Sequence, residues 1–265
     1  MQIETHQPTF YLPHGGGPCF FMEDPAGVWT EMQAFLETIP TRLPERPKAI
    51  LVISGHWETE GFALTGAARP PLLFDYYNFP PHTYQLRYDV PGDPALAGRA
   101  AGLLQAASLH ARIDPERGLD HGVFVPLKVA FPNASIPVVE MSVDKNLDPA
   151  LHLAAGRALA PLRDEGVLIL ATGMSFHNMR GYGDPHSTVP SQEFDRWLTH
   201  AVEEPASQRA EALKAWATAP GGRYSHPREE HLVPLMVAAG ASEGAGERIY
   251  SEMVLKTAIS GFRFP

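Results

Sequence analysis

The stretch Leu51-Val-Ile-Ser-Gly-His-Trp57 decides the fold. Together with Ile50, its first three residues form a compact apolar run, which is typical of a strand buried on both faces of a parallel sheet. Ser54 and Gly55 allow the chain to turn, so we expect the strand to end there and to present His56 at its carboxyl end. In open α/β folds, ligands and catalytic groups collect at that end of the strands.

Two further segments have the same order of residues. Thr9-Phe-Tyr-Leu-Pro13 leads into His14-Gly-Gly-Gly-Pro18, and Val167 to Ala171 leads into Thr172-Gly-Met-Ser-Phe-His177. Each segment places a histidine after a buried strand and a run of small residues. Because the carboxyl ends of parallel strands meet at one edge of a sheet, these three histidines are expected to reach one crevice. Imidazole is the commonest neutral metal ligand, so the pattern predicts a metal site there.

The order of the expected elements favours a single α/β domain over residues 1–265. A helix at about 25–38, opened by Asp24-Pro25, separates the first two strands, and this is the repeating unit of a parallel sheet. We therefore predict a central, mostly parallel or mixed sheet flanked by helices, with the metal site at the carboxyl ends of its strands. Further strands are expected at 136–143, 167–171 and 249–255, and further helices from Asp93-Pro94, Asp148-Pro149 and Pro190-Ser191.

Composition excludes several classes of partner. The formal net charge is -9 and no basic run is present, which argues against a nucleic-acid partner. No apolar run reaches the roughly 20 residues that a membrane-spanning helix needs, and no signal peptide is recognisable. The single cysteine, Cys19, fits a reducing compartment. We expect a cytoplasmic protein with no membrane partner.

Common catalytic motifs of other enzyme classes do not occur. The His14-Gly-Gly-Gly-Pro18 segment is not followed by a G-x-S-x-G nucleophile motif, as an esterase would require. The chain has no Walker lysine, no G-x-G-x-x-G and no H-E-x-x-H. His121, which precedes an expected helix, and His226 and His231, which lie at another expected helix start, could cover the crevice. Whether His177 or His226 also binds the metal stays open at this point.

The histidine motifs together resemble a known family. They are His14-Gly-Gly-Gly-Pro, Ser-Gly-His56-Trp, Asp-His121-Gly, Phe-His177-Asn and Pro-Arg-Glu-Glu-His231-Leu-Val-Pro-Leu. As an ordered set over nearly the whole chain, they resemble class III extradiol ring-cleaving dioxygenases of the LigB superfamily, and more narrowly the DOPA 4,5-dioxygenase-type branch.

The resemblance implies a role for each histidine. His14, His56 and His231 would hold the metal, and His177 would be the catalytic acid and base. His121 would lie over the substrate as a further catalytic residue, with Asp120 fixing its tautomer or capping its loop. Many members of the wider superfamily use two histidines and a glutamate, whereas here His231 occupies the position of that carboxylate. An all-imidazole site suits Zn(II) as well as Fe(II).

The implied activity is Fe(II)-dependent extradiol cleavage of a small catecholic substrate with O₂, by a monomer or homodimer. His226 and Tyr84, the latter at the end of an aromatic loop, are candidates for substrate contact. The alternative is a zinc-binding protein of the same fold that acts as a hydrolase or as a non-catalytic interaction module.

Overall fold

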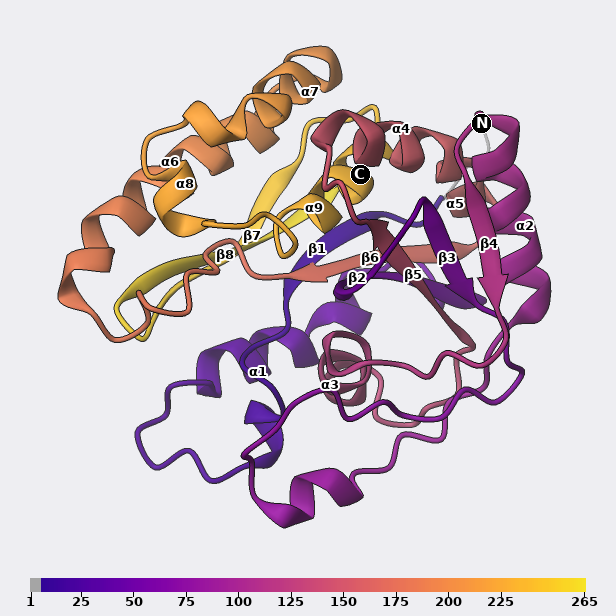
Figure 1. Cartoon of the computed structure of the whole chain (residues 1–265), viewed down its shortest axis with the longest axis horizontal. Helices are drawn as coiled ribbons and strands as arrows, with labels where there is room; N and C mark the ends of the chain where they lie inside the picture. Colours follow the sequence, from indigo (N-terminus) through magenta and orange to yellow (C-terminus); the bar gives the residue numbers. More distant parts are fainter. Residues whose placement is uncertain (1–5) are drawn as a thin grey trace.

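A mixed sheet of eight strands forms the centre of the computed structural model, which describes residues 6–265 (Figure 1). Its order is β4-β3-β5-β2-β6-β1-β8-β7. The four central strands β5, β2, β6 and β1 are mutually parallel, whereas β3, β7 and β8 each pair antiparallel with a neighbour. The bounds are β1 (Thr9–Pro13), β2 (Ala49–Thr59), β3 (Phe62–Thr65), β4 (Ala111–Asp114), β5 (Val138–Asp144), β6 (Val167–Gly173), β7 (Glu247–Val254) and β8 (Thr257–Phe264).

Helices cover both faces of this sheet (Figure 1). One face packs on α1 (Thr30–Glu37) and α3 (His121–Ala130). The other face is covered by the remaining longer helices: α2 (Pro94–Ala106), α4 (Pro149–Leu159), α6 (Thr188–Glu203), α7 (Ala206–Lys214) and α9 (Val233–Gly240). Shorter elements are α5 (Pro161–Asp164), α8 (Gly222–Ser225) and 3₁₀ turns at Cys19–Phe21, Ile39–Arg42, Pro81–Gln85, Pro185–Ser187 and Trp216–Thr218. The predicted single α/β domain with a flanked, mixed sheet is confirmed.

The apolar run at the start of β2 is explained by these two helical layers. Ile50 and Val52 point into the core on the side of α1 and α3, whereas Leu51 and Ile53 point into the core on the side of α9. All four side chains are fully buried. Successive strand residues face opposite sides of a sheet, so a strand covered on both sides needs apolar residues at every position.

The prediction that this strand ends at Ser54 was wrong. β2 continues to Thr59, and its register with β5 shifts between Ile53 and Glu58. Gly55 serves a close approach instead of a turn, since a Cβ atom there would lie 2.3 Å from the carbonyl oxygen of Glu230. His56 therefore lies within the irregular part of the strand, beside the segment that carries Glu230.

Other predicted boundaries also need correction. The first helix begins at Thr30, because the Asp24 carboxylate accepts hydrogen bonds from the backbone of Val28 and Trp29 and so closes a separate turn. His231 precedes α9 and does not lie within its first turn, since that helix begins at Val233. The strand β8, which separates β1 from β7, was not predicted. Within residues 6–265, every helix is too short or too polar to span a lipid bilayer.

Candidate active site

Five histidines line one cavity of about 470 Å³ at the carboxyl ends of the central parallel strands: His14, His56, His121, His177 and His231. This volume lies in the range typical of sites for small organic ligands. The position is the one at which open α/β sheets bind their ligands. The larger cavities and grooves elsewhere on the described chain do not contain a comparable group of histidines.

A glycine turn places His14 at the cavity. The backbone N–H of His14 donates to the carbonyl of Gly173, which continues the pairing of β1 with β6 by one residue. The chain then turns through Gly15 and Gly17, whose φ angles are +79° and +56°. Side chains rarely adopt such angles, and a Cβ atom at Gly17 would lie 2.7 Å from the Phe79 ring. The glycines of the His14 motif therefore allow a tight turn beside the site.

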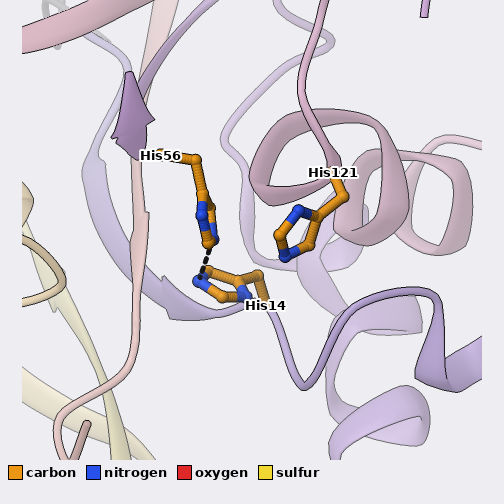
Figure 2. A group of neighbouring side chains, drawn as sticks. All are labelled: His14, His56 and His121. Carbon is orange, nitrogen blue, oxygen red and sulfur yellow. Dashed lines mark hydrogen bonds between the residues drawn. The ribbon is translucent and has the colours of Figure 1, made fainter. Parts of the chain in front are cut away.

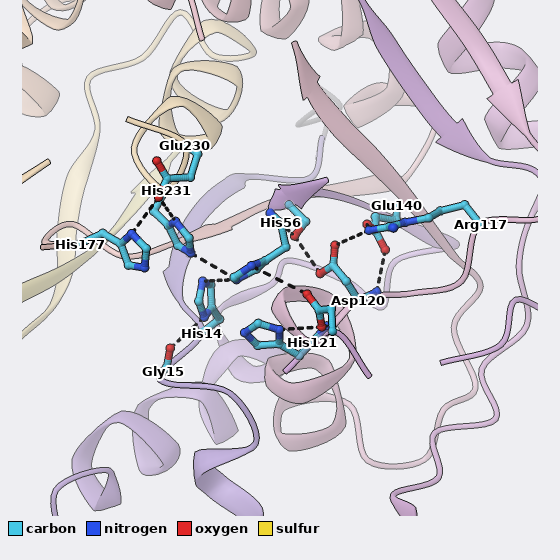
Figure 3. A network of polar contacts seen from close by, with 12 residues as sticks. His14, Gly15, His56, Arg117, Asp120, His121, Glu140, His177, Glu230 and His231 are labelled. Carbon is cyan, nitrogen blue, oxygen red and sulfur yellow. Dashed lines mark hydrogen bonds and ion pairs between the residues drawn. The ribbon is translucent and has the colours of Figure 1, made fainter. Parts of the chain in front are cut away.

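The Nε2 atoms of three histidines converge in the cavity (Figure 3). His56 Nε2 lies 3.3 Å from His14 Nε2 and 3.2 Å from His231 Nε2. Nδ1 of His14 faces the carbonyl oxygen of Gly15 at 2.9 Å, and Nδ1 of His231 faces a carboxylate oxygen of Glu230 at 3.0 Å. Because both oxygens accept, both Nδ1 atoms carry hydrogen, and the Nε2 lone pairs of these two rings point toward His56.

This arrangement fits a divalent metal ion. A proton can bridge one pair of facing lone pairs, whereas three converging imidazole nitrogens require a shared cation to avoid repulsion. Burial, followed by the neighbouring histidines, lowers the pKa values of His14 and His231 well below the usual value. Burial likewise lowers the pKa of His56 to about 4. All three rings are thus held in the neutral form that binds metals.

His121 stands beside this group at the first residue of α3 (Figure 2). Its ring centroid lies 4.0 Å from that of His56 and 5.6 Å from that of His14. Nδ1 of His121 donates to Asp75 Oδ1 at 2.7 Å, and the backbone N–H of His121 donates to the same oxygen at 3.0 Å. Ligand atoms of His14, His56 and His121 lie close enough together to form a second possible metal-binding group.

Asp75, not Asp120, fixes the orientation of the His121 ring. The carboxylate of Asp120 instead accepts from Ser54 and pairs with Arg117 at 3.3 Å, and it does not cap α3. Asp75 lies in the loop 74–84, more than forty residues earlier in the sequence, and no local motif marks it. The predicted role of Asp120 therefore requires this correction.

A single carboxylate joins His177 to His231. Glu230 Oε1 accepts from His177 Nδ1 at 2.9 Å and from His231 Nδ1 at 3.0 Å (Figure 3). The two rings are stacked, with centroids 3.4 Å apart. Burial raises the pKa of Glu230, but the hydrogen bond from His177 outweighs burial and the pKa is lowered overall. Glu230 is therefore an ionised acceptor that orients both rings.

The structure places two predicted substrate-binding residues away from the cavity lining. His226 is fully buried, its Nε2 lies 2.9 Å from the Ser175 carbonyl, and its ring packs against Phe194 and Trp216. Tyr84 is half-buried behind Tyr76, with ring centroids 5.2 Å apart. Direct substrate contact by His226 or Tyr84 is therefore not what their positions favour.

Aromatic residues that the sequence did not single out form part of the cavity lining instead. They are Trp29, Tyr76, Tyr77, Phe79 and Tyr182. Three of them belong to the predicted aromatic loop, so the loop was identified correctly as a neighbour of the site but the contacting residue within it was not. The alternation of proline and aromatic residues in that loop gives no periodicity from which facing side chains can be chosen.

Residues 3–262 match the family model described as the catalytic LigB subunit of aromatic ring-opening dioxygenase. The chain belongs to this family, as the resemblance of its histidine motifs predicted. It is 38% identical to a dioxygenase, tasH, of Hapsidospora irregularis over 260 residues, covering 89% of this chain and 78% of that protein. It is 37% identical to a 4,5-DOPA dioxygenase extradiol of Beta vulgaris, covering 93% of this chain and 90% of that protein.

A bacterial relative and a solved structure agree with this assignment. The 4,5-DOPA dioxygenase extradiol of Escherichia coli (strain K12) is 35% identical, covering 91% of this chain and 87% of that protein. The crystal structure of an uncharacterized protein from Escherichia coli K12 superposes with a TM-score of 0.78 at 28% identity, covering 98% of this chain and 100% of that chain. The similarity thus extends over the whole sheet and both helical layers.

Proposed function

We propose that this protein is a non-haem Fe(II)-dependent extradiol dioxygenase that opens the aromatic ring of a catecholic substrate with O₂. The observation that carries the proposal is the convergence of His14, His56 and His231 through their Nε2 atoms, beside a cavity that two further histidines line. The family, whose described activity is aromatic ring opening, supports the same reaction class.

We assign the metal to His14, His56 and His231. A bound Fe(II) would supply adjacent binding positions for the catechol oxygens and for O₂, together with a path for electrons between them. Glu230 and the Gly15 carbonyl hold the Nδ1–H groups of His231 and His14, so both rings are oriented before a metal arrives. The neutral state of the three buried rings means that metal binding does not require the displacement of protons from them.

His177 is the proposed acid and base. Its Nδ1–H donates to Glu230, so Nε2 carries the lone pair and can accept a proton from a catechol hydroxyl. The carboxylate of Glu230 then stabilises the resulting imidazolium at a distance of 2.9 Å. The same nitrogen returns the proton to the oxygen that departs from the ring, which restores the enzyme.

His121 is proposed to position the reacting oxygen atoms. Asp75 accepts from its Nδ1, which leaves the second ring nitrogen for a hydrogen bond within the cavity. The aromatic side chains of Trp29, Tyr76 and Phe79 provide flat apolar surface for the substrate ring. A planar diol is therefore the kind of ligand that these residues fit best.

Anaerobic reconstitution with Fe(II), followed by a panel of catechols, tests the proposal. Ring opening predicts O₂ consumption and a yellow semialdehyde-type product from at least one catechol. A sample loaded with Zn(II), which the same three imidazoles suit, is the matched control and should give neither signal. If the Fe(II) sample consumes no O₂ and forms no product with any catechol, the proposed reaction is wrong.

A further inference from the structure

The cavity contains a large apolar surface next to its histidines. Apart from those histidines and three glycines, the lining consists of aromatic, methionine and leucine side chains and one carboxylate, Asp75. Three of the apolar residues extend to the rim and are exposed: Tyr77 at 79%, Met179 at 70% and Leu255 at 39%. Exposed large apolar side chains around a concave site are a feature of binding surfaces.

Two tyrosine hydroxyls of this lining are already engaged. Tyr76 donates to the carbonyl of Thr83 at 2.7 Å, and Tyr182 donates to the carbonyl of Phe176 at 2.6 Å. Both rings therefore present mainly their carbon atoms to a ligand. Asp75 is also engaged, because it accepts two hydrogen bonds from His121.

No lysine or arginine lines the cavity in the described part of the chain, and residues 1–5 contain neither. Two arginines in the surrounding structure have carboxylate partners. Arg228 forms two hydrogen bonds with Glu58 and lies 3.6 Å from Glu230, and Arg117 pairs with Asp120 while stacking over the ring of Trp57. Arg180, which follows the rim residue Met179, is exposed and does not contribute to the lining.

We propose, on the basis of the proposed function, that the substrate is a catechol with a neutral, apolar substituent, alkyl or aryl, and that catechols bearing a carboxylate are poor substrates. A carboxylate entering this cavity would lose its water without gaining a cationic partner, and it would approach the negative charge of Asp75. An apolar substituent would instead gain from burial against Tyr76, Phe79 and Met174.

A matched pair of ligands isolates the charge: 3-(3,4-dihydroxyphenyl)propanoic acid and its methyl ester. The two share the ring and the chain length and differ in the negative charge. With the Fe(II)-reconstituted protein, we expect kcat/KM for the ester to exceed that for the acid by at least tenfold. In a separate anaerobic titration followed by tryptophan fluorescence, we expect the ester to bind at least tenfold more tightly. Equal values, or a preference for the acid, would overturn the proposal.

Substitutions at the rim test the missing cation directly. Met179→Arg adds a cation at an exposed position and should raise the acid-to-ester ratio of kcat/KM by about tenfold, whereas the neutral control Met179→Gln should leave that ratio unchanged. Arg180→Ala should also leave it unchanged. A selective loss of acid binding in Arg180→Ala would show that this arginine serves the substrate, which contradicts the proposal.

The two proposals fail in different ways. If neither ligand is turned over by the Fe(II) protein and the wider catechol panel is also inert, the proposed reaction is wrong. The anaerobic titration still ranks the acid and the ester in that case, so the preference for a neutral ligand is decided independently of turnover.

Discussion

Glu230 Oε1 lies 2.9 Å from His177 Nδ1, and this contact links two residues that are 53 positions apart in the chain. The same oxygen accepts from Nδ1 of the adjacent His231. One carboxylate thereby orients both a proposed metal ligand and the proposed acid and base. Its position follows from the close packing of the segment before α9 against Gly55 of β2.

Glu230→Gln should weaken both functions of this contact. An amide oxygen can accept from one ring, but it carries no charge to stabilise an imidazolium at His177. Partners of metal-binding histidines typically contribute about 10- to 100-fold to metal affinity or activity. We expect losses of that size in Fe(II) affinity, measured by competition with a chelator, and in kcat.

The neighbouring residue supplies the control. Glu229 pairs with Arg223, whose side chain is half exposed, and an ion pair of this kind contributes about 1 kcal/mol or less to stability. Glu229→Gln should therefore leave metal affinity and kcat close to those of the parent protein. Equal effects of the two substitutions would mean that Glu230 has no particular role.

His177→Ala should retain the metal and lose turnover. Acid–base assistance typically contributes 10²- to 10⁴-fold, so kcat should fall by about 10²-fold or more. The measurements are metal content after gel filtration and single-substrate kinetics. Loss of the metal along with activity would identify His177 as a ligand and would require a different base.

His56→Ala should lose the metal itself. His56 Nε2 is the nitrogen that lies close to both His14 and His231, so its removal opens the centre of the donor group. We expect metal content to fall at least tenfold in the variant dialysed against a weak chelator. His186→Ala is the control, because that side chain is 90% exposed and lies outside the cavity lining. Unchanged metal content in His56→Ala would contradict the assigned ligand set.

The metal-free protein should lose stability in acid, partly through His226. Burial lowers the pKa of His226 to about 3, whereas the unfolded chain has the ordinary value of about 6.5. The unfolded state therefore binds one more proton between these values, and the stability contributed by neutral His226 is lost as the pH falls below about 6.5.

Replacing His226 by Gln tests that contribution. Between pH 6 and about pH 4, the free energy of unfolding of the parent should decrease more steeply than that of the variant, by up to about 1.4 kcal/mol per pH unit. Urea denaturation of both metal-free proteins at several pH values measures the two slopes. Parallel slopes would show that His226 is not buried in its neutral form.

The sequence predicted the parts of the fold that depend on local patterns. The apolar runs at Ile50 and Val167 were buried strands, and the aspartate–proline pairs at 93–94 and 148–149 began helices α2 and α4. The aspartate–proline pair at 24–25 did not, since the Asp24 side chain closed a turn before the helix. A side chain that can cap either structure does not by itself determine which one forms.

The candidate site was predictable only where strand ends or motifs marked it. The five histidines of the cavity came from such motifs, and the structure brings them together. Asp75 and the aromatic wall were not predictable, because their positions depend on how a loop of the 70s folds back over α3. His226 carries the same chemistry in sequence as the others, and only burial separates it from them.

The most direct test of ring opening uses isotopically labelled O₂ with the Fe(II)-reconstituted protein and a neutral alkylcatechol. An extradiol dioxygenase predicts a yellow ring-opened product that contains both atoms of one O₂ molecule, as measured by mass spectrometry before the aldehyde oxygen exchanges with water. A product without labelled oxygen, or a colourless diacid formed by cleavage between the two hydroxyl carbons, would contradict the account.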